Sequence, residues 1–281
     1  MMLEIAIGDT YGAGFEFMDE SFVEENNDMT KYYKNALDKI EPGKYTDDTQ
    51  MSIAIAEFML SGKDWTKENI AQYFLDCFKR DERTSYATGF YKFLLKTNDS
   101  KEFLENIITE SVRNGAAMRS VPLSFIKDIE ELKEKAKLQA SITHDTMEGI
   151  LSSQAVALIG NYFIYQNGDK NTLKDYVNSQ IDSFFIDDSN ERVQCHGLDT
   201  LDAVLTVLKQ SNSLSAVIKN SIALGGDTDS VAAIATGLAS LSSQYKNDLD
   251  EFPFLYDDLE DGEYGKNYLL DLNVRLFEAF K

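Results

Sequence analysis

Cysteine, proline, histidine and positive charge are all scarce in this chain of 281 residues. Its two cysteines, Cys77 and Cys195, are too few and too far apart for a disulfide framework or a zinc site. There are only three prolines, and the period-two alternation typical of half-buried strands is absent. No stretch reaches the roughly 18 consecutive apolar residues that a membrane span needs, so no membrane segment is expected.

Basic residues are outnumbered by acidic ones, 27 against 48, which gives a formal net charge of −21. An electrostatic nucleic-acid binder needs a basic surface, so nucleic-acid binding is not expected. An anionic ligand held by backbone amides or by a metal ion stays possible. Glu4 and Asp9 interrupt the short apolar run at the N-terminus, so it does not resemble a signal peptide, and we expect a soluble, cytoplasmic protein.

Apolar residues recur with the 3.6-residue period of the α-helix. Loops are expected near 18–30, 41–45, 80–86, 112–122, 187–197 and 242–262, with the acidic stretch 246–262 as a mobile surface loop. Neither an internal repeat nor a dividing linker is present, so residues 1–281 are predicted to form one mostly helical domain. Helices are expected from Asp47 to Gly62, after Thr66 with Cys77 on the buried face, and over 147–165, Leu198–Leu208, Leu214–Leu224, Val231–Leu241 and 266–280.

Two short acidic motifs, Tyr45-Thr46-Asp47-Asp48-Thr49 and Gly225-Gly226-Asp227-Thr228-Asp229-Ser230, each lead into an apolar helical pattern. Carboxylates gathered at the start of a helix repel one another unless a cation lies between them. Hard divalent cations such as Mg²⁺ prefer oxygen ligands, so the motifs are interpreted as two halves of one metal site. The alternative is helix N-capping, which needs one such residue per helix and would be favoured for either motif alone.

With these motifs in place, five sequence blocks resemble the ADP-ribosylglycohydrolases, a family that includes the dinitrogenase reductase-activating glycohydrolases and the ADP-ribosylarginine and ADP-ribosylserine hydrolases. The resemblance runs from residue 8 to about residue 240, and the two acidic motifs in this order are highly specific. The blocks are Gly8-Asp9-Thr10-Tyr11-Gly12-Ala13-Gly14-Phe15-Glu16, Tyr45–Thr49, Asn114-Gly115-Ala116-Ala117-Met118-Arg119 with Pro122, Thr143-His144-Asp145, and Gly225–Ser230.

The resemblance implies an all-α, orthogonally packed helical domain with two Mg²⁺ or Mn²⁺ ions. It also implies that Glu16, Asp47 and Asp229 take part in catalysis. Two hard cations would bind the ribose diol and a water whose pKa they lower. By motif, the implied metal ligands are Thr46, Asp47, Asp48, Asp227, Asp229 and Ser230.

On the substrate side, the resemblance places Glu16 near the ribose and His144 against the ADP-ribose. The segment Asn114–Met118 resembles a substrate loop, with Asn114, Gly115, Ala116 and Met118 as contacts, because small residues let backbone N–H groups approach a pyrophosphate. Read alone, Asn-Gly is typical of a tight turn, and both interpretations can hold. Tyr86 matches a substrate-side segment of the family more loosely.

The function implied is that of a metal-dependent hydrolase. It would cleave the bond between ADP-ribose and a modified arginine or serine side chain of a protein. Water would attack the anomeric carbon through an oxocarbenium-like transition state. Two alternatives stay open at this point: a non-catalytic, crystallin-like relative that binds ADP-ribose, and a hydrolase of another ADP-ribose conjugate. The six intact oxygen donors argue against the first alternative, because a site that had lost its catalytic function need not keep them.

Overall fold

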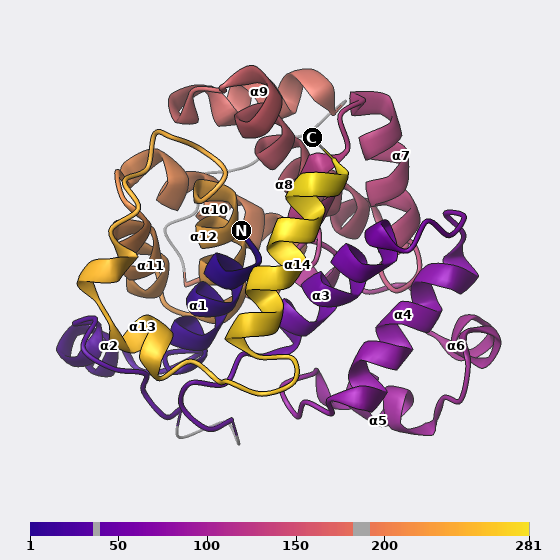
Figure 1. The fold of residues 1–281 in the computed structure, drawn as a ribbon, viewed down its shortest axis with the longest axis horizontal. Coiled ribbons are helices and arrows are strands. Elements are labelled where there is room, and N and C mark those ends of the chain that lie inside the picture. Colours follow the sequence, from indigo (N-terminus) through magenta and orange to yellow (C-terminus); the bar gives the residue numbers. More distant parts are fainter. Residues whose placement is uncertain (36–39, 182–191, 281) are drawn as a thin grey trace.

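The computed structural model describes residues 1–35, 40–181 and 192–280. These residues form fourteen α-helices and four short 3₁₀ helices, and pairing between extended segments is limited to isolated bridges. The predicted all-α fold is confirmed (Figure 1). A continuous set of buried apolar side chains reaches from the first helix to the last. That residues 1–281 make up a single domain stays a prediction.

Helices α1 (Met2–Ala13) and α12 (Thr228–Ala239) pack closely against each other, and nearly all of their side chains are buried. Glycines on α1 permit this contact: a Cβ on Gly8 would lie 2.3 Å from the carbonyl oxygen of Ala232, and one on Gly12 would lie 2.5 Å from the Cα of Asp229. The last turn of α1 therefore touches the first turn of α12, where the second acidic motif lies.

Helix α3 (Asp47–Leu60) begins at the first acidic motif and packs beside α1. Helix α14 (Lys266–Ala279), yellow in Figure 1, crosses in front of α1 and α3 and contacts both. Helix α8 (Met147–Gln166), apolar on nearly every side, is central as its pattern predicts, and it ends at Asn167 in the left-handed conformation (φ 49°). Helices α1, α3 and α12 contact one another, and the two motifs stand at the first turns of α3 and α12.

The other helices cover this centre (Figure 1). Helices α4, α5 and α6 lie at one side of the molecule, and α2 and α13 lie at the opposite side. Their bounds, with those of the 3₁₀ helices η1 to η4, are α2 Glu20–Asn26, α4 Lys67–Arg80, α5 Thr88–Lys96, α6 Ser100–Asn106, η1 Asn114–Ala116, η2 Val121–Phe125, α7 Ile129–Ala140, η3 Lys170–Thr172, α9 Leu173–Gln180, α10 Gly197–Gln210, α11 Leu214–Ala223, η4 Leu249–Glu251 and α13 Phe254–Asp257.

Two expected loops are wrong. The stretch 18–30 contains α2, which buries a single side chain and so has little helical pattern to detect. The acidic stretch 246–262 contains η4 and α13, and Leu255 and Leu259 within it are buried. Glu260 pairs with Arg83 at 2.6 Å, which fixes this stretch to the protein instead of leaving it mobile. Of the loop expected at 187–197, residues 187–191 lie outside the described residues.

None of the described helices is both long enough and apolar enough to cross a lipid bilayer.

Candidate metal and substrate site

The structure brings the two acidic motifs together at the N-terminal ends of α3 and α12. The hydroxyl of Ser230 lies close enough to Asp48 to favour the ionised form of that carboxyl. Asp227 and Asp48 also lie close enough to Asp229 for their negative charges to act on its carboxylate. Donors separated by about 180 positions in the sequence therefore face one another.

Buried carboxylates at this meeting point repel each other. Burial, followed by the charges of Asp9, Asp47 and Asp227, raises the pKa of Asp48 well above its ordinary range. Burial and the charges of Glu16, Asp227 and Asp48 do the same to the pKa of Asp229. Burial also raises the pKa of Asp47. Without a cation, full ionisation of this cluster is unfavourable.

Two carboxylate oxygens in the cluster, Oδ1 of Asp48 and Oδ1 of Asp229, are enclosed and have no hydrogen-bond partner among the described residues. Enclosed polar atoms normally have partners, so such exceptions call for an explanation. Ligand atoms of Glu16, Asp227 and Asp229 lie within 4.8 Å of one another. A hard divalent cation fits this donor set, because it would coordinate the unpaired oxygens and cancel the repulsion.

Helix capping accounts for one of the motif residues. The side chain of Thr46 accepts a hydrogen bond from the backbone N–H of Asp48 (3.2 Å), so Thr46 caps α3. Asp227 stands at the N-cap position of α12, but its side chain makes no capping hydrogen bond. Capping alone therefore leaves the remaining carboxylates of both motifs unexplained.

Asp9 anchors the first motif, and the sequence interpretation gave it no role. Its carboxylate, fully buried on α1, accepts hydrogen bonds from the backbone N–H groups of Thr46 (2.9 Å) and Thr49 (3.0 Å) and from the Thr49 hydroxyl. These bonds satisfy free N–H groups at the start of α3. One feature of the sequence could have indicated this role: Asp9 is a carboxylate in the middle of an apolar helical stretch, inside the first of the five blocks.

The glycines of the second motif are required by its backbone. Gly225 and Gly226 have φ values of 65° and 82°, in the left-handed region that favours glycine. A Cβ on Gly226 would lie 2.0 Å from the carbonyl oxygen of Val193. That oxygen accepts a hydrogen bond from the N–H of Asp227 (3.0 Å), so the residues preceding α10 fix the path of the motif.

Asn114 connects the expected substrate loop to the acidic cluster. Its Nδ2 donates to Oδ2 of Asp227 (2.8 Å) and to the hydroxyl of Thr200 (3.0 Å). The loop itself is the 3₁₀ turn η1, as the tight-turn interpretation predicted. Ala116 and Met118 are buried. The thiol of Cys195 also lies against Asp227, and burial raises the pKa of that thiol, with the Asp227 charge adding to the shift.

The other expected substrate residues lie around the cluster at different depths. Glu16 follows α1 and is partly exposed next to Asp227 and Asp229. Tyr86 is buried and donates its hydroxyl hydrogen to Oε1 of Gln50 (2.7 Å), which places it behind the start of α3. His144 lies against the loop, because a Cβ on Gly115 would come within 2.8 Å of its Cε1.

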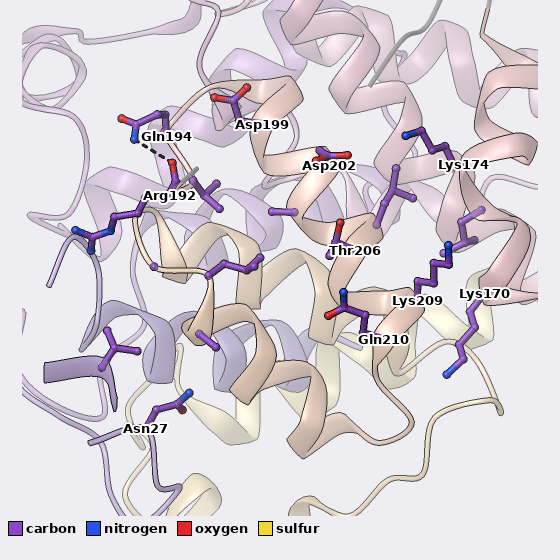
Figure 2. A pocket seen from close by; sticks show the side chains of 18 of the residues that line it. Asn27, Lys170, Lys174, Arg192, Gln194, Asp199, Asp202, Thr206, Lys209 and Gln210 are labelled. Carbon is purple, nitrogen blue, oxygen red and sulfur yellow. Dashed lines mark hydrogen bonds between the residues drawn. The ribbon is translucent and has the colours of Figure 1, made fainter. Parts of the chain in front are cut away.

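A large cavity lies elsewhere. It measures about 1270 Å³ between α2, α9, α10 and the segment that begins at Arg192. Figure 2 shows Lys174, Lys209 and Asp202 around it, so its lining mixes both signs of charge. Apart from Gly225, no motif residue lines it. The acidic cluster is therefore the candidate site.

Known proteins are similar to this chain along most of its length. The family model for ADP-ribosylglycohydrolase matches residues 1–280. ADP-ribosylarginine hydrolase Tri1 of Serratia proteamaculans is 24% identical over 264 residues, which are 88% of this chain and 71% of that protein. ADP-ribosyl-[dinitrogen reductase] glycohydrolase of Rhodospirillum rubrum is 23% identical, covering 84% of this chain and 82% of its own length.

A third relative is ADP-ribosylhydrolase ARH3 of Gallus gallus, which is 25% identical over 77% of this chain, and the chain spans 62% of that relative's length. Among solved structures, one described as an ADP-ribosylglycohydrolase-related protein complex superposes with a TM-score of 0.75 at 21% identity. The match covers 100% of this chain and 96% of that one, so the fold is shared along the whole chain.

Proposed function

Because the chain belongs to the ADP-ribosylglycohydrolase family, as the match over residues 1–280 shows, we propose that it removes ADP-ribose from modified protein side chains with the help of two divalent cations. Its relatives are hydrolases of ADP-ribosylated substrates by name. The observation that carries the metal requirement is the pair of enclosed, unpartnered oxygens on Asp48 and Asp229.

The cations would be Mg²⁺ or Mn²⁺, held by donors from both motifs. When bound, such ions supply Lewis acidity that orients ribose hydroxyls and lowers the pKa of a water. Asn114 holds the Asp227 carboxylate in place through its 2.8 Å hydrogen bond. Asp9 similarly holds the backbone of Thr46. The proposed ligands are Thr46, Asp47, Asp48, Asp227, Asp229 and Ser230.

The chain's own groups would bind the substrate and move its protons. The reaction adds the oxygen of water to the anomeric carbon, breaks the bond to the side-chain nitrogen or oxygen, and returns a proton to that leaving atom. Glu16, which is partly exposed beside Asp227 and Asp229, would exchange a proton with the water or the leaving group. Asp47 and Asp229 would act at the same centre, and the η1 loop and His144 would bind the ADP-ribose.

The direct test is incubation with peptides that carry ADP-ribosyl-arginine or ADP-ribosyl-serine, with Mg²⁺ or Mn²⁺, and chromatography of released ADP-ribose. We expect release from at least one peptide, loss of release with EDTA, and recovery when the metal is restored. A folded protein that releases ADP-ribose from neither peptide contradicts the proposal, and free ADP-ribose esters then test the remaining conjugates.

Asp227→Asn is the matched variant for this assay. It preserves the size of the side chain and the hydrogen bond that Asn114 donates, while removing the charge that attracts a cation. We expect unchanged helical circular dichroism, at least about a hundredfold slower release, and weaker Mg²⁺ binding by calorimetry. Unchanged Mg²⁺ affinity would argue against this ligand set.

A further inference from the structure

Arg119 is a buried cation without a counter-ion. It is 1% exposed, and no carboxylate of the described residues pairs with it. Its guanidinium lies over the ring of Phe74 at 4.4 Å and donates from Nε to Oε1 of Gln139 (2.5 Å). Burial lowers its pKa to about 9, so it stays charged at neutral pH. Burying an unpaired charge is costly, which suggests a role beyond packing.

A chain of hydrogen bonds runs from this cation to His144. Arg119 Nη2 lies 2.8 Å from the hydroxyl oxygen of Thr143, and that oxygen lies 2.7 Å from Nδ1 of His144. A guanidinium can only donate, so the Thr143 oxygen accepts from Arg119. The Thr143 hydroxyl hydrogen then has one acceptor among the described residues, namely Nδ1 of His144.

This direction determines which nitrogen of His144 carries the proton. If Nδ1 carried it, the Thr143 oxygen would accept twice and its own buried hydrogen would lack an acceptor, at a cost of about 1 to 3 kcal/mol. Nδ1 is therefore an acceptor, and the proton of the neutral ring is on Nε2. Burial, aided by the charges of Arg119 and Arg113, lowers the pKa of His144 to about 3, in agreement with a neutral ring.

The protonated nitrogen faces the expected substrate loop. A Cβ on Gly115 would lie 2.8 Å from Cε1 and 3.1 Å from Nε2 of His144, so the lack of a side chain at Gly115 lets this edge of the imidazole pack against the loop. Nε2 makes no hydrogen bond to any residue in the described part of the chain, whereas Nδ1 is bound to Thr143. The Nε2–H group thus lies at the η1 loop and has no hydrogen-bond partner among the described residues.

We propose that Arg119 and Thr143 are positioning residues that hold His144 as a neutral Nε2–H donor for an oxygen of bound ADP-ribose. The proposal rests on the proposed function for the identity of the ligand, and on the hydrogen-bond chain for the tautomer. The positive charge of Arg119 polarises the Thr143 hydroxyl, which in turn makes Nε2–H a stronger donor. Gln139 fixes the guanidinium, since it accepts from Nε and, through its backbone oxygen, from Nη2 at 3.0 Å.

Nitrogen NMR of histidine tests the tautomer directly, because the chain has only two histidines. With ¹⁵N-histidine, a His196→Gln variant assigns the two rings. In the wild type near neutral pH, His144 is expected to show a protonated Nε2 and an unprotonated Nδ1. In Thr143→Val the ring is expected to change to a tautomer mixture, and in Thr143→Ser the wild-type pattern is expected to return. A wild-type ring protonated on Nδ1, or on both nitrogens, overturns the proposal without any variant.

Calorimetry with free ADP-ribose tests the use of the donor. Thr143→Val is expected to bind about three- to tenfold more weakly, and Thr143→Ser to stay within about twofold of the wild type. ADP-ribose is also expected to shift the Nε2 resonance of the wild type. An unchanged Nε2 resonance, or equal affinities for Thr143→Val and the wild type, contradicts the proposal. If ADP-ribose shifts Nε2 but no peptide releases ADP-ribose, the proposed activity fails and this inference stands.

Discussion

Asp229 stands at the first turn of α12, enclosed beside Glu16, Asp227 and Asp48. One of its oxygens has no partner among the described residues. Burial and these neighbouring charges raise its pKa in the folded protein. Because its folded pKa exceeds its unfolded pKa, ionisation of Asp229 at neutral pH lowers the free energy of unfolding of the metal-free protein.

Asp229→Asn is therefore expected to stabilise the metal-free protein while abolishing its response to metal. The amide removes the repulsion, and we expect the free energy of unfolding in EDTA to rise by about 1 to 3 kcal/mol. Urea unfolding with EDTA and then with MgCl₂ measures both effects. Asp250→Asn, an exposed carboxylate on η4, is the control and should change neither value. Destabilisation of Asp229→Asn in EDTA would show that the carboxylate is satisfied without metal.

At this scale the sequence singles out the expected metal ligands but not the residues that hold them in place. Thr46, Asp48 and Asp229 belong to motifs that can be recognised in the sequence, because each motif gathers carboxylates and hydroxyls within a few residues. Asp9 and Thr200 do not, because each acts on a residue 37 or 86 positions away and only the folded chain reveals the pair. The same holds for Arg119, whose partners Gln139 and Thr143 follow 20 and 24 residues later.

Among the helices, the contact between α1 and α12 determines where the second motif lies. Gly12 sits at this contact, where a Cβ would meet Asp229 Cα at 2.5 Å and the carbonyl oxygen of Thr228 at 2.6 Å. Backbone atoms cannot move aside as the end of a flexible side chain can. An added methyl group must therefore push the first turn of α12 away from α1.

Gly12→Ala is expected to weaken Mg²⁺ binding at least tenfold, because it displaces Asp229 relative to Asp48. Overpacking of this kind costs about 1 to 3 kcal/mol of stability. Gly89→Ala in α5 is the matched control, since a Cβ there meets nothing within 4 Å, and it should be neutral or stabilising by up to about 1 kcal/mol. Calorimetric Mg²⁺ affinity and urea midpoints are measured for both variants. Equal affinities would mean that the contact does not position the ligands.

Most helices with a long apolar pattern were predicted, but α1 was not: it has twelve residues and is almost wholly buried, and the sequence showed there only a short apolar run interrupted by Glu4 and Asp9. The short helices α2 and α13 were not predicted either. Helix α8 follows the pattern predicted over 147–165 to within two residues. Helix α2 buries only Val23, so its seven residues carry no readable period. Helix α13 has four residues in an acidic stretch, and its attachment depends on a hydrogen bond from the Tyr32 hydroxyl to the carbonyl oxygen of Leu255 at 2.8 Å, which no local pattern reveals.

Over the whole molecule, the net charge of −21 opposes folding through general repulsion, while the acidic cluster opposes it through a few buried groups. Salt distinguishes these two effects. Surface repulsion is largely screened at high ionic strength, whereas repulsion among buried carboxylates is screened much less. Any pH dependence that survives high salt therefore reports mainly on buried groups such as Asp47, Asp48 and Asp229.

In high NaCl with EDTA, the free energy of unfolding is expected to fall as the pH rises from about 5 to about 8. The sign follows from the raised folded pKa values of Asp47, Asp48 and Asp229: the stability they contribute is complete below their unfolded pKa and is lost as pH rises through the folded values.

MgCl₂ at matched ionic strength is expected to reverse the slope, because metal binds the deprotonated ligands and stabilises the folded state. Urea titrations across this range measure the slope, and Asp229→Asn should flatten it in EDTA. Parallel slopes with and without Mg²⁺ would show that no metal couples to these carboxylates.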